Sequence, residues 1–123
     1  MQNLKLNLDF KRDSQTMRQM MATELQDFLA TGADTVKIDV REDIELEFGM
    51  LENAIHIPMQ SVPGQLNELE KYKDETIIVI CRSGRRSDQI GQFLEQMGFK
   101  DVINLADGMN GWAANVDTNM TVY

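Results

Sequence analysis

The sequence predicts a single α/β domain built on a largely parallel central sheet. Short strand patterns alternate along the chain with amphipathic helical patterns, an order typical of parallel sheets flanked by helices on both faces. One strand pattern, residues 76–80 (TIIVI), is apolar at nearly every position, as expected for a strand that is buried on both faces. The length of 123 residues suits one domain with one hydrophobic core.

The N-terminal segment combines an extension with the first helical pattern. Residues 1–19 are expected to precede the domain, which spans 20–116 and is followed by a tail at 117–123. In the extension, alternating apolar residues are typical of a half-buried strand or a loose segment: Leu4, Leu6, Leu8 and Phe10. Within residues 16–30, apolar side chains recur at helical spacing, which predicts one helix or two capped helices ending before Gly32.

The remaining elements follow in alternation. Pro58 is expected to end a strand, and Gly98 is expected to follow the last residue of a helix as its C-terminal cap. The other predicted strands cover residues 36–40 (VKIDV), 54–57 (AIHI) and 102–105 (VINL), and the other predicted helices cover 62–72, 87–97 and 108–114.

Composition and charge exclude several classes of function. The net charge of −8 argues against binding nucleic acid, which requires an extended basic surface. No apolar run approaches the roughly 20 residues that span a bilayer, and the N-terminus lacks the apolar centre of a signal peptide. We therefore expect a soluble, cytoplasmic protein that does not bind membranes. A single cysteine agrees with this location, because it permits no internal disulfide.

That single cysteine stands where a buried strand gives way to a cluster of positive charge. Residues 81–86 contain Cys81, Arg82, Ser83, Gly84, Arg85 and Arg86. If this loop curls around the sulfur at the carboxyl end of a parallel strand, its backbone N–H groups point at one centre. The N-terminus of the next helix and the guanidinium groups add positive charge. We therefore expect the pKa of the Cys81 thiol to lie well below its ordinary value of about 8.5.

Polar residues around the loop are expected to support it. Ser87 lies where the next helix begins and can cap it. Asp39 and Arg41 end a neighbouring buried strand, and carboxyl ends of parallel strands meet at one rim, so both could border the pocket. The alternative is that Asp39 binds loop amides and that Arg41 pairs with a nearby glutamate, Glu42 or Glu45.

Two other groups of polar residues are expected to have no catalytic role. His56, the only histidine, lies beside a proline at a strand end, and nothing in the sequence brings it to the cysteine. The acidic residues between 42 and 47 lack a histidine and an EF-hand pattern, so they are expected to form a solvated loop face and no metal site.

Several segments together resemble the rhodanese family of sulfurtransferases. CRSGRRS, following a buried strand, is similar to the family's active-site loop, Cys-Arg-x-Gly-x-Arg. The segments IDVRE (38–42), AIHIP (54–58) and GFKDVINLADGMNGW (98–112) resemble further family motifs, and the resemblance covers roughly residues 20–114. The chain departs from the family pattern at Met50, where the family has histidine, and at Asn53 and Asp107, where it has glycine.

The resemblance implies a rhodanese-like fold and a sulfur-transfer mechanism. A Cys81 thiolate would take the outer sulfur of an anionic donor such as thiosulfate and carry it as a persulfide. Residues 82–86 would bind the anion through their backbone amides and arginines. A small thiol, cyanide or a protein would accept the sulfur from outside the chain, and no metal or organic cofactor is implied.

Two other classes of function use similar features. Cysteine-loop phosphatases and arsenate reductases also bind anions this way, but the Cys-x5-Arg loop of tyrosine phosphatases would require an arginine at position 87, which is Ser87. Here the spacing is Cys-x4-Arg, ending at Arg86. A non-enzymatic interaction module or a dedicated sulfur carrier is the second alternative, and the presence of Cys81 counts against a module without chemistry.

Overall fold

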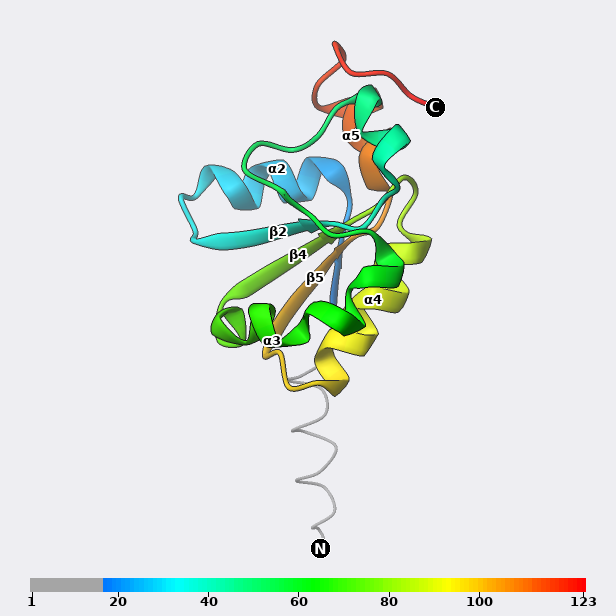
Figure 1. Cartoon of the computed structure of the whole chain (residues 1–123). Coiled ribbons are helices and arrows are strands. Elements are labelled where there is room, and N and C mark those ends of the chain that lie inside the picture. The colour runs from blue at the N-terminus through cyan, green and yellow to red at the C-terminus, as the bar shows by residue number, and fades with distance from the viewer. Residues whose placement is uncertain (1–16) are drawn as a thin grey trace, which may run out of the picture.

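Five parallel strands form the central sheet in the computed structural model, which describes residues 17–123 (Figure 1). The strand order is β1-β5-β4-β2-β3, and every neighbouring pair is parallel. The predicted class, an α/β domain with a parallel sheet, is therefore confirmed. The strands are β1 (Arg18–Met20), β2 (Thr35–Asp39), β3 (Ile55–His56), β4 (Thr76–Ile80) and β5 (Asp101–Leu105).

Helices cover both faces of the sheet. Helices α2 and α5 lie on one face, and α3 and α4 lie on the other (Figure 1). In residues 17–123, no helix is long and apolar enough to cross a membrane. The α-helices are α2 (Ala22–Ala30), α3 (Leu66–Leu69), α4 (Arg85–Gln96) and α5 (Gly108–Asn115), and the 3-10 turns are η1 (Asp43–Phe48), η2 (Met59–Ser61), η3 (Pro63–Gln65) and η4 (Glu70–Tyr72).

Strand β4 lies at the centre of the sheet and divides the core into two layers. Its alternate residues Ile77 and Val79 pack with α4, while Ile78 and Ile80 pack with α2 and α5. All four side chains are fully buried, as the continuous apolar run predicts. Cys81 continues this alternation and therefore points to the α4 side.

The helix expected within residues 16–30 is wrong at its N-terminal end. Arg18–Met20 form the edge strand β1, which pairs with β5, and α2 begins only at Ala22. Pairing of this segment with β5 outweighs its helical spacing, because β5 would otherwise present an unpaired edge. Glu24 accepts a hydrogen bond from the Met21 backbone N–H (2.9 Å) and so closes the first turn of α2.

One further expectation changes in detail, and one departure from the family pattern has a structural explanation. The helix expected over residues 62–72 is broken into short turns around α3, because Pro63 lacks a backbone N–H and Gly64 favours other conformations. Asn53 replaces the family's glycine and adopts a positive φ of 65°, which asparagine tolerates better than most residues. The alternating pattern at residues 4–10 lies outside the described residues.

Candidate active site

The loop that carries Cys81 is held in place by the N-terminus of α5. Backbone N–H groups of Met109 and Asn110 donate to the carbonyl oxygens of Cys81 (2.8 Å) and Arg82 (3.0 Å). Gly108 makes this approach possible, because a Cβ atom there would lie 2.1 Å from the Arg82 carbonyl oxygen. The closing motif of the sequence thus fixes the backbone of the cysteine loop.

Gly84 ends the loop and starts α4. Its φ of 94° is left-handed, and it is the N-cap of a helix whose first residue is Arg85, two positions earlier than expected. Ser87 is therefore wrong as the predicted cap. It lies in the first turn, fully buried, with its hydroxyl turned toward the sulfur.

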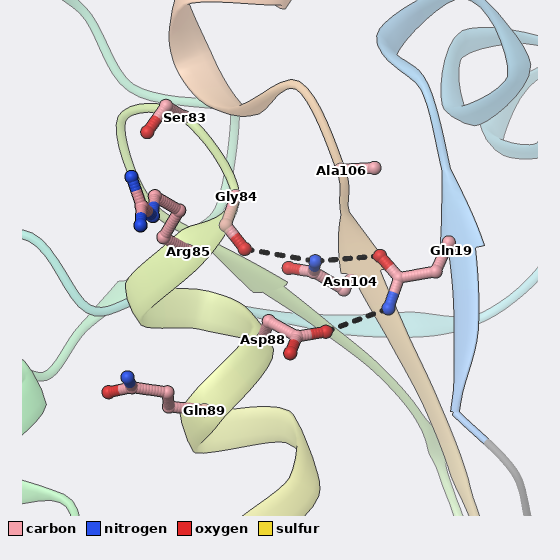
Figure 2. A pocket seen from close by; sticks show the side chains of 8 residues that line it. All are labelled: Gln19, Ser83, Gly84, Arg85, Asp88, Gln89, Asn104 and Ala106. Atoms are coloured by element: carbon pink, nitrogen blue, oxygen red, sulfur yellow. Dashed lines mark hydrogen bonds between the residues drawn. The ribbon is translucent and has the colours of Figure 1, made fainter.

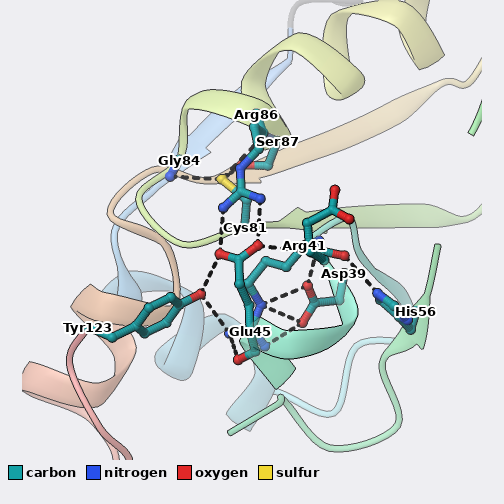
Figure 3. Close-up of polar contacts among 10 residues, drawn as sticks. Asp39, Arg41, Glu45, His56, Cys81, Gly84, Arg86, Ser87 and Tyr123 are labelled. Atoms are coloured by element: carbon teal, nitrogen blue, oxygen red, sulfur yellow. Dashed lines mark hydrogen bonds and ion pairs between the residues drawn. The ribbon is translucent and has the colours of Figure 1, made fainter. Parts of the chain in front are cut away.

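Two backbone N–H groups and one hydroxyl group converge on the buried sulfur of Cys81, whose residue is 1% exposed (Figure 3). The Gly84 N–H lies 3.1 Å from Sγ, the Ser87 N–H lies 3.4 Å away, and the Ser87 hydroxyl oxygen lies 3.3 Å away. Burial raises the pKa of the Cys81 thiol, but hydrogen bonds from the Ser87 hydroxyl and from the amides of Ser87, Ser83 and Gly84 outweigh burial and lower it. The direction expected from the sequence is confirmed, and its source is these neutral donors.

A chain of polar side chains leads from the sulfur to an open pocket of about 370 Å³. Figure 2 shows the end of this chain at the pocket, where Asn104, Gln19 and Asp88 are joined by hydrogen bonds. The Ser87 hydroxyl donates to Asn104 Oδ1 (2.5 Å), and Asn104 Nδ2 donates to Gln19 Oε1 (2.8 Å). Gln19 Nε2 in turn donates to Asp88 Oδ1 (2.8 Å). Asn104 is 2% exposed, and it therefore connects the sulfur's surroundings with the wall of the pocket. The exposed Arg85 lines the same pocket.

On the opposite side of the loop, Asp39 and Arg41 form a fully buried ion pair. Their closest contact, between Arg41 Nη2 and Asp39 Oδ2, is 2.8 Å, so the pairing of Arg41 with a neighbouring glutamate carboxylate is not the one observed. Arg41 also donates to the carbonyl oxygens of Gly49 (2.6 Å) and Glu45 (3.3 Å). The ion pair therefore fixes the η1 segment beside the cysteine loop. His56 Nε2 lies 2.7 Å from the Arg41 carbonyl oxygen, away from the sulfur.

Glu45 reaches from η1 to the arginine that ends the loop motif (Figure 3). Two nitrogens of Arg86 donate to its two carboxylate oxygens at 2.7 and 2.8 Å. The Arg86 hydrogen bond is the largest cause that lowers the pKa of Glu45, to about 2, and the same bond raises the pKa of Arg86. The expected solvated face is thus wrong for Glu45, whose side chain is only 15% exposed.

Tyr123 completes this charged network from the C-terminal segment. Its hydroxyl donates to Glu45 Oε2 (2.8 Å) and accepts from Arg41 Nη1 (3.2 Å). Its ring stacks on Phe48 with centroids 4.2 Å apart, and the Arg82 guanidinium lies over the Tyr123 ring at 5.0 Å from its centroid. Arg82 also donates to the Tyr123 carbonyl oxygen. Two of the three loop arginines are therefore engaged by other residues of the protein.

Sequence reasoning did not single out three of these residues for the site. Asn104 carried a usable signal, because it is the one polar residue of the apolar strand segment VINL. Glu45 was hidden within an acidic run, and Tyr123 lies 42 positions beyond the cysteine in a segment without a motif. Only tertiary contacts bring these two residues to the loop.

Comparison with known proteins agrees with this architecture. The family model described as the Rhodanese-like domain matches residues 21–115. A sulfurtransferase of Allochromatium vinosum is 36% identical over 69% of this chain and 78% of its own length. A Bacillus subtilis protein provisionally named as the sulfur carrier YrkF is 38% identical over 65% of this chain and 42% of its own.

The fold comparison leads to the same family. The crystal structure of a rhodanese-like domain protein from Staphylococcus aureus superimposes with a TM-score of 0.72 at 31% identity, and the match covers 87% of this chain and 99% of that one. The names of the relatives support a role in sulfur transfer in general. The sequence motifs, the parallel sheet and these matches together show that the chain belongs to the rhodanese-like domain family.

Proposed function

We propose that the protein is a sulfurtransferase that moves a sulfane sulfur through a persulfide on Cys81. The observation that carries this proposal is the convergence of the Gly84 and Ser87 backbone N–H groups, with the Ser87 hydroxyl beside them, on one buried sulfur atom. Such donors stabilise negative charge on sulfur, and the thiolate is the nucleophilic form of cysteine. A chain of the rhodanese-like family with this arrangement is equipped to accept sulfur from an anionic donor.

In the first proposed step, the Cys81 thiolate attacks the outer sulfur of thiosulfate. A new S–S bond forms to Cys81, the S–S bond of thiosulfate breaks, and sulfite leaves with the bonding electron pair. The persulfide keeps one negative charge, which the amides of residues 82–86 stabilise together with the helix N-terminus. Arg85 is the loop arginine expected to meet the donor, because Arg82 and Arg86 are engaged by Tyr123 and Glu45.

In the second proposed step, an external nucleophile removes the sulfur. A thiolate or cyanide attacks the outer persulfide sulfur, and Cys81 leaves as a thiolate, ready for another cycle. Cys81 is the only cysteine of the chain, so no resolving thiol is available within it. The two half-reactions need no metal ion and no organic cofactor, and they predict ping-pong kinetics.

Intact mass spectrometry after incubation with thiosulfate tests the proposal. Wild type should gain the mass of one sulfur atom and lose it again on addition of cyanide, with release of thiocyanate. Cys81→Ser should gain nothing, while Ser83→Ala, which keeps every backbone donor, should gain sulfur as wild type does. Absence of the adduct on wild type, or an equal adduct on Cys81→Ser, would contradict the proposal.

A dedicated sulfur carrier is the second candidate function, favoured by the likeness to the Bacillus subtilis protein. A carrier would form the same Cys81 adduct but would turn over small acceptors slowly and release its sulfur to a protein partner. Measuring the rate of persulfide loss with cyanide, with a small thiol and with candidate protein acceptors separates the two. Hydrolysis of a phosphate ester without any persulfide would instead favour the phosphatase alternative.

A further inference from the structure

The Ser87 hydroxyl has one proton and two neighbours that can accept it. Its oxygen lies 2.5 Å from Asn104 Oδ1 and 3.3 Å from Cys81 Sγ. All three residues are buried, with Asn104 at 2% exposure and Cys81 at 1%. In this closed environment, a proton donated to one acceptor is withheld from the other.

The orientation of the Asn104 amide decides which bond exists in the structure. Asn104 Nδ2 lies 3.1 Å from the Gly84 carbonyl oxygen and 2.8 Å from Gln19 Oε1. The Gly84 oxygen can only accept, so the amide nitrogen must face it and Oδ1 must face Ser87. Because Oδ1 carries no proton, the hydroxyl of Ser87 donates to Asn104. The sulfur can then contact the hydroxyl only as an S–H donor.

We propose that Asn104 is a positioning residue that holds the Ser87 proton while Cys81 is a thiol and releases it to the sulfur when Cys81 becomes an anion. The release is favourable because a hydrogen bond to a charged acceptor is stronger than one between neutral groups. Rotation about the Cβ–Oγ bond of Ser87 suffices to redirect the proton, because the oxygen already lies near both acceptors. This inference rests on the proposed role of Cys81 as a nucleophile.

Charged groups on the surrounding elements do not take part in this exchange. Arg86 is paired with Glu45, and Arg41 is paired with Asp39. Asp88, on α4, accepts from Gln19 and Gln92, and neither bond reaches the sulfur. Asp107, at the start of α5, accepts from the backbone N–H of Ala22. The redirected proton of Ser87 is therefore a neutral contribution, separate from these charges.

Titration of the thiolate by its ultraviolet absorbance tests the exchange in the full chain. Asn104→Leu keeps the side-chain shape but removes the competing acceptor, so the pKa of Cys81 should fall by about half a unit to one unit, the value of one neutral hydrogen bond. Ser87→Ala should raise the pKa by a similar amount. Gln19→Leu is the matched control, because Gln19 contacts Asn104 but not Ser87, and it should leave the pKa unchanged.

The double variant Ser87→Ala with Asn104→Leu makes the test specific. Without the hydroxyl there is no proton to compete for, so Asn104→Leu should no longer lower the pKa. A fall of equal size in this background, or no fall in the single variant, would overturn the inference. Should Asn104→Leu not fold, Asn104→Ala removes the same oxygen with a smaller side chain, and an unchanged pKa in Ser87→Ala would overturn the inference by itself.

The mass experiment with thiosulfate separates this inference from the proposed function. If wild type gains no sulfur while the thiolate titrations follow the expected pattern, the proton exchange stands and the sulfur-transfer proposal fails. If wild type gains sulfur but the pKa does not respond to Asn104→Leu, the proposed function stands and the positioning role of Asn104 is wrong.

Discussion

The two sides of the Cys81 loop differ in the kind of contact that they make. On the α4 and β5 side, the sulfur contacts neutral donors, and the polar chain continues through Ser87 and Asn104. On the η1 side, the contacts are ionic: Asp39 with Arg41, and Glu45 with Arg86. No ionic group of the second side donates a hydrogen bond to the sulfur within residues 17–123.

This division shows that a cluster of arginines need not act on the cysteine beside it. The pKa of Cys81 is lowered by hydrogen bonds from N–H and O–H groups, while Arg86 is largely neutralised by Glu45. The ionic side instead joins the loop to η1 and to Tyr123. We therefore expect changes on the ionic side to alter stability most, and changes on the neutral side to alter the sulfur.

Arg41→Met is expected to have the largest effect on stability. It leaves Asp39 buried and without its partner, and removing one member of a buried pair costs about 3–5 kcal/mol. Urea unfolding monitored by circular dichroism measures the loss. Lys100→Met is the matched control, because its ion pair with Asp74 is exposed and should be worth less than about 1 kcal/mol. Equal losses of unfolding free energy in both variants would show that the buried pair stabilises the protein no more than the exposed pair does.

Gly84→Ala should destabilise the protein less than Arg41→Met does, but it should change both the stability and the pKa of Cys81. A Cβ atom there would lie 2.1 Å from the Ala106 carbonyl oxygen, and alanine is strained at a φ of 94°. Left-handed strain and overpacking together predict a loss of about 2–4 kcal/mol in the free energy of unfolding. The displaced Gly84 N–H should also weaken its bond to the sulfur and raise the pKa of Cys81.

Gly64→Ala provides the comparison for this variant. Apart from the residues adjacent to it in the chain, no atom of residues 17–123 lies within 4 Å of a Cβ built on Gly64, so the change should stay within about 1 kcal/mol. If Gly84→Ala were equally mild and left the pKa of Cys81 unchanged, the loop would have more freedom than its contacts with Ala106 indicate.

Features of the fold and site that depend on residues close together in the sequence could be predicted. The run 76–80 identified β4 because a strand buried on both faces is apolar on both. Strand β1 could not be recognised, because three residues are too few to show a period and its partner β5 lies some 85 positions away.

The ionic side of the site depended on contacts that no local pattern reveals. Glu45 resembles its acidic neighbours in the sequence, and only its ion pair with Arg86, 41 positions away, distinguishes it. The start of α4 was misplaced because Ser87 is a common N-cap residue, whereas Gly84 takes that position in the structure. Arginines in the first turn oppose the helix dipole, and pairing of Arg86 with Glu45 offsets this unfavourable charge.

Glu45→Gln is expected to change how stability depends on acid. The pKa of Glu45 in the folded protein is lowered to about 2, chiefly by the Arg86 hydrogen bond. A folded pKa below the unfolded value of about 4.3 means that its stabilisation is complete above pH 4.3 and is lost as the pH falls toward 2. Glu45→Gln should remove about 2 kcal/mol of this acid-sensitive stability.

Urea midpoints at neutral pH and near pH 3 measure that effect. The variant should be less stable than wild type at neutral pH, and the difference should narrow in acid. Glu68→Gln, which changes an exposed glutamate of α3, should leave the acid dependence as it is in wild type. If the difference in stability between wild type and Glu45→Gln stays constant with pH, the pair with Arg86 does not favour the ionised carboxylate of Glu45.

Arg86→Ala should have the smallest effect on the pKa of Cys81. It tests directly whether neutral donors, and not the loop arginines, control the sulfur. Loss of the positive charge should raise the pKa of Cys81, but by less than about half a unit, because Glu45 already offsets that charge. Removing both charges with Arg86→Ala and Glu45→Gln should bring the pKa back toward the wild-type value. Thiolate absorbance measures all three proteins. A rise in Arg86→Ala as large as the rise in Ser87→Ala would contradict the comparison, because the arginine would then control the sulfur as strongly as the hydroxyl does.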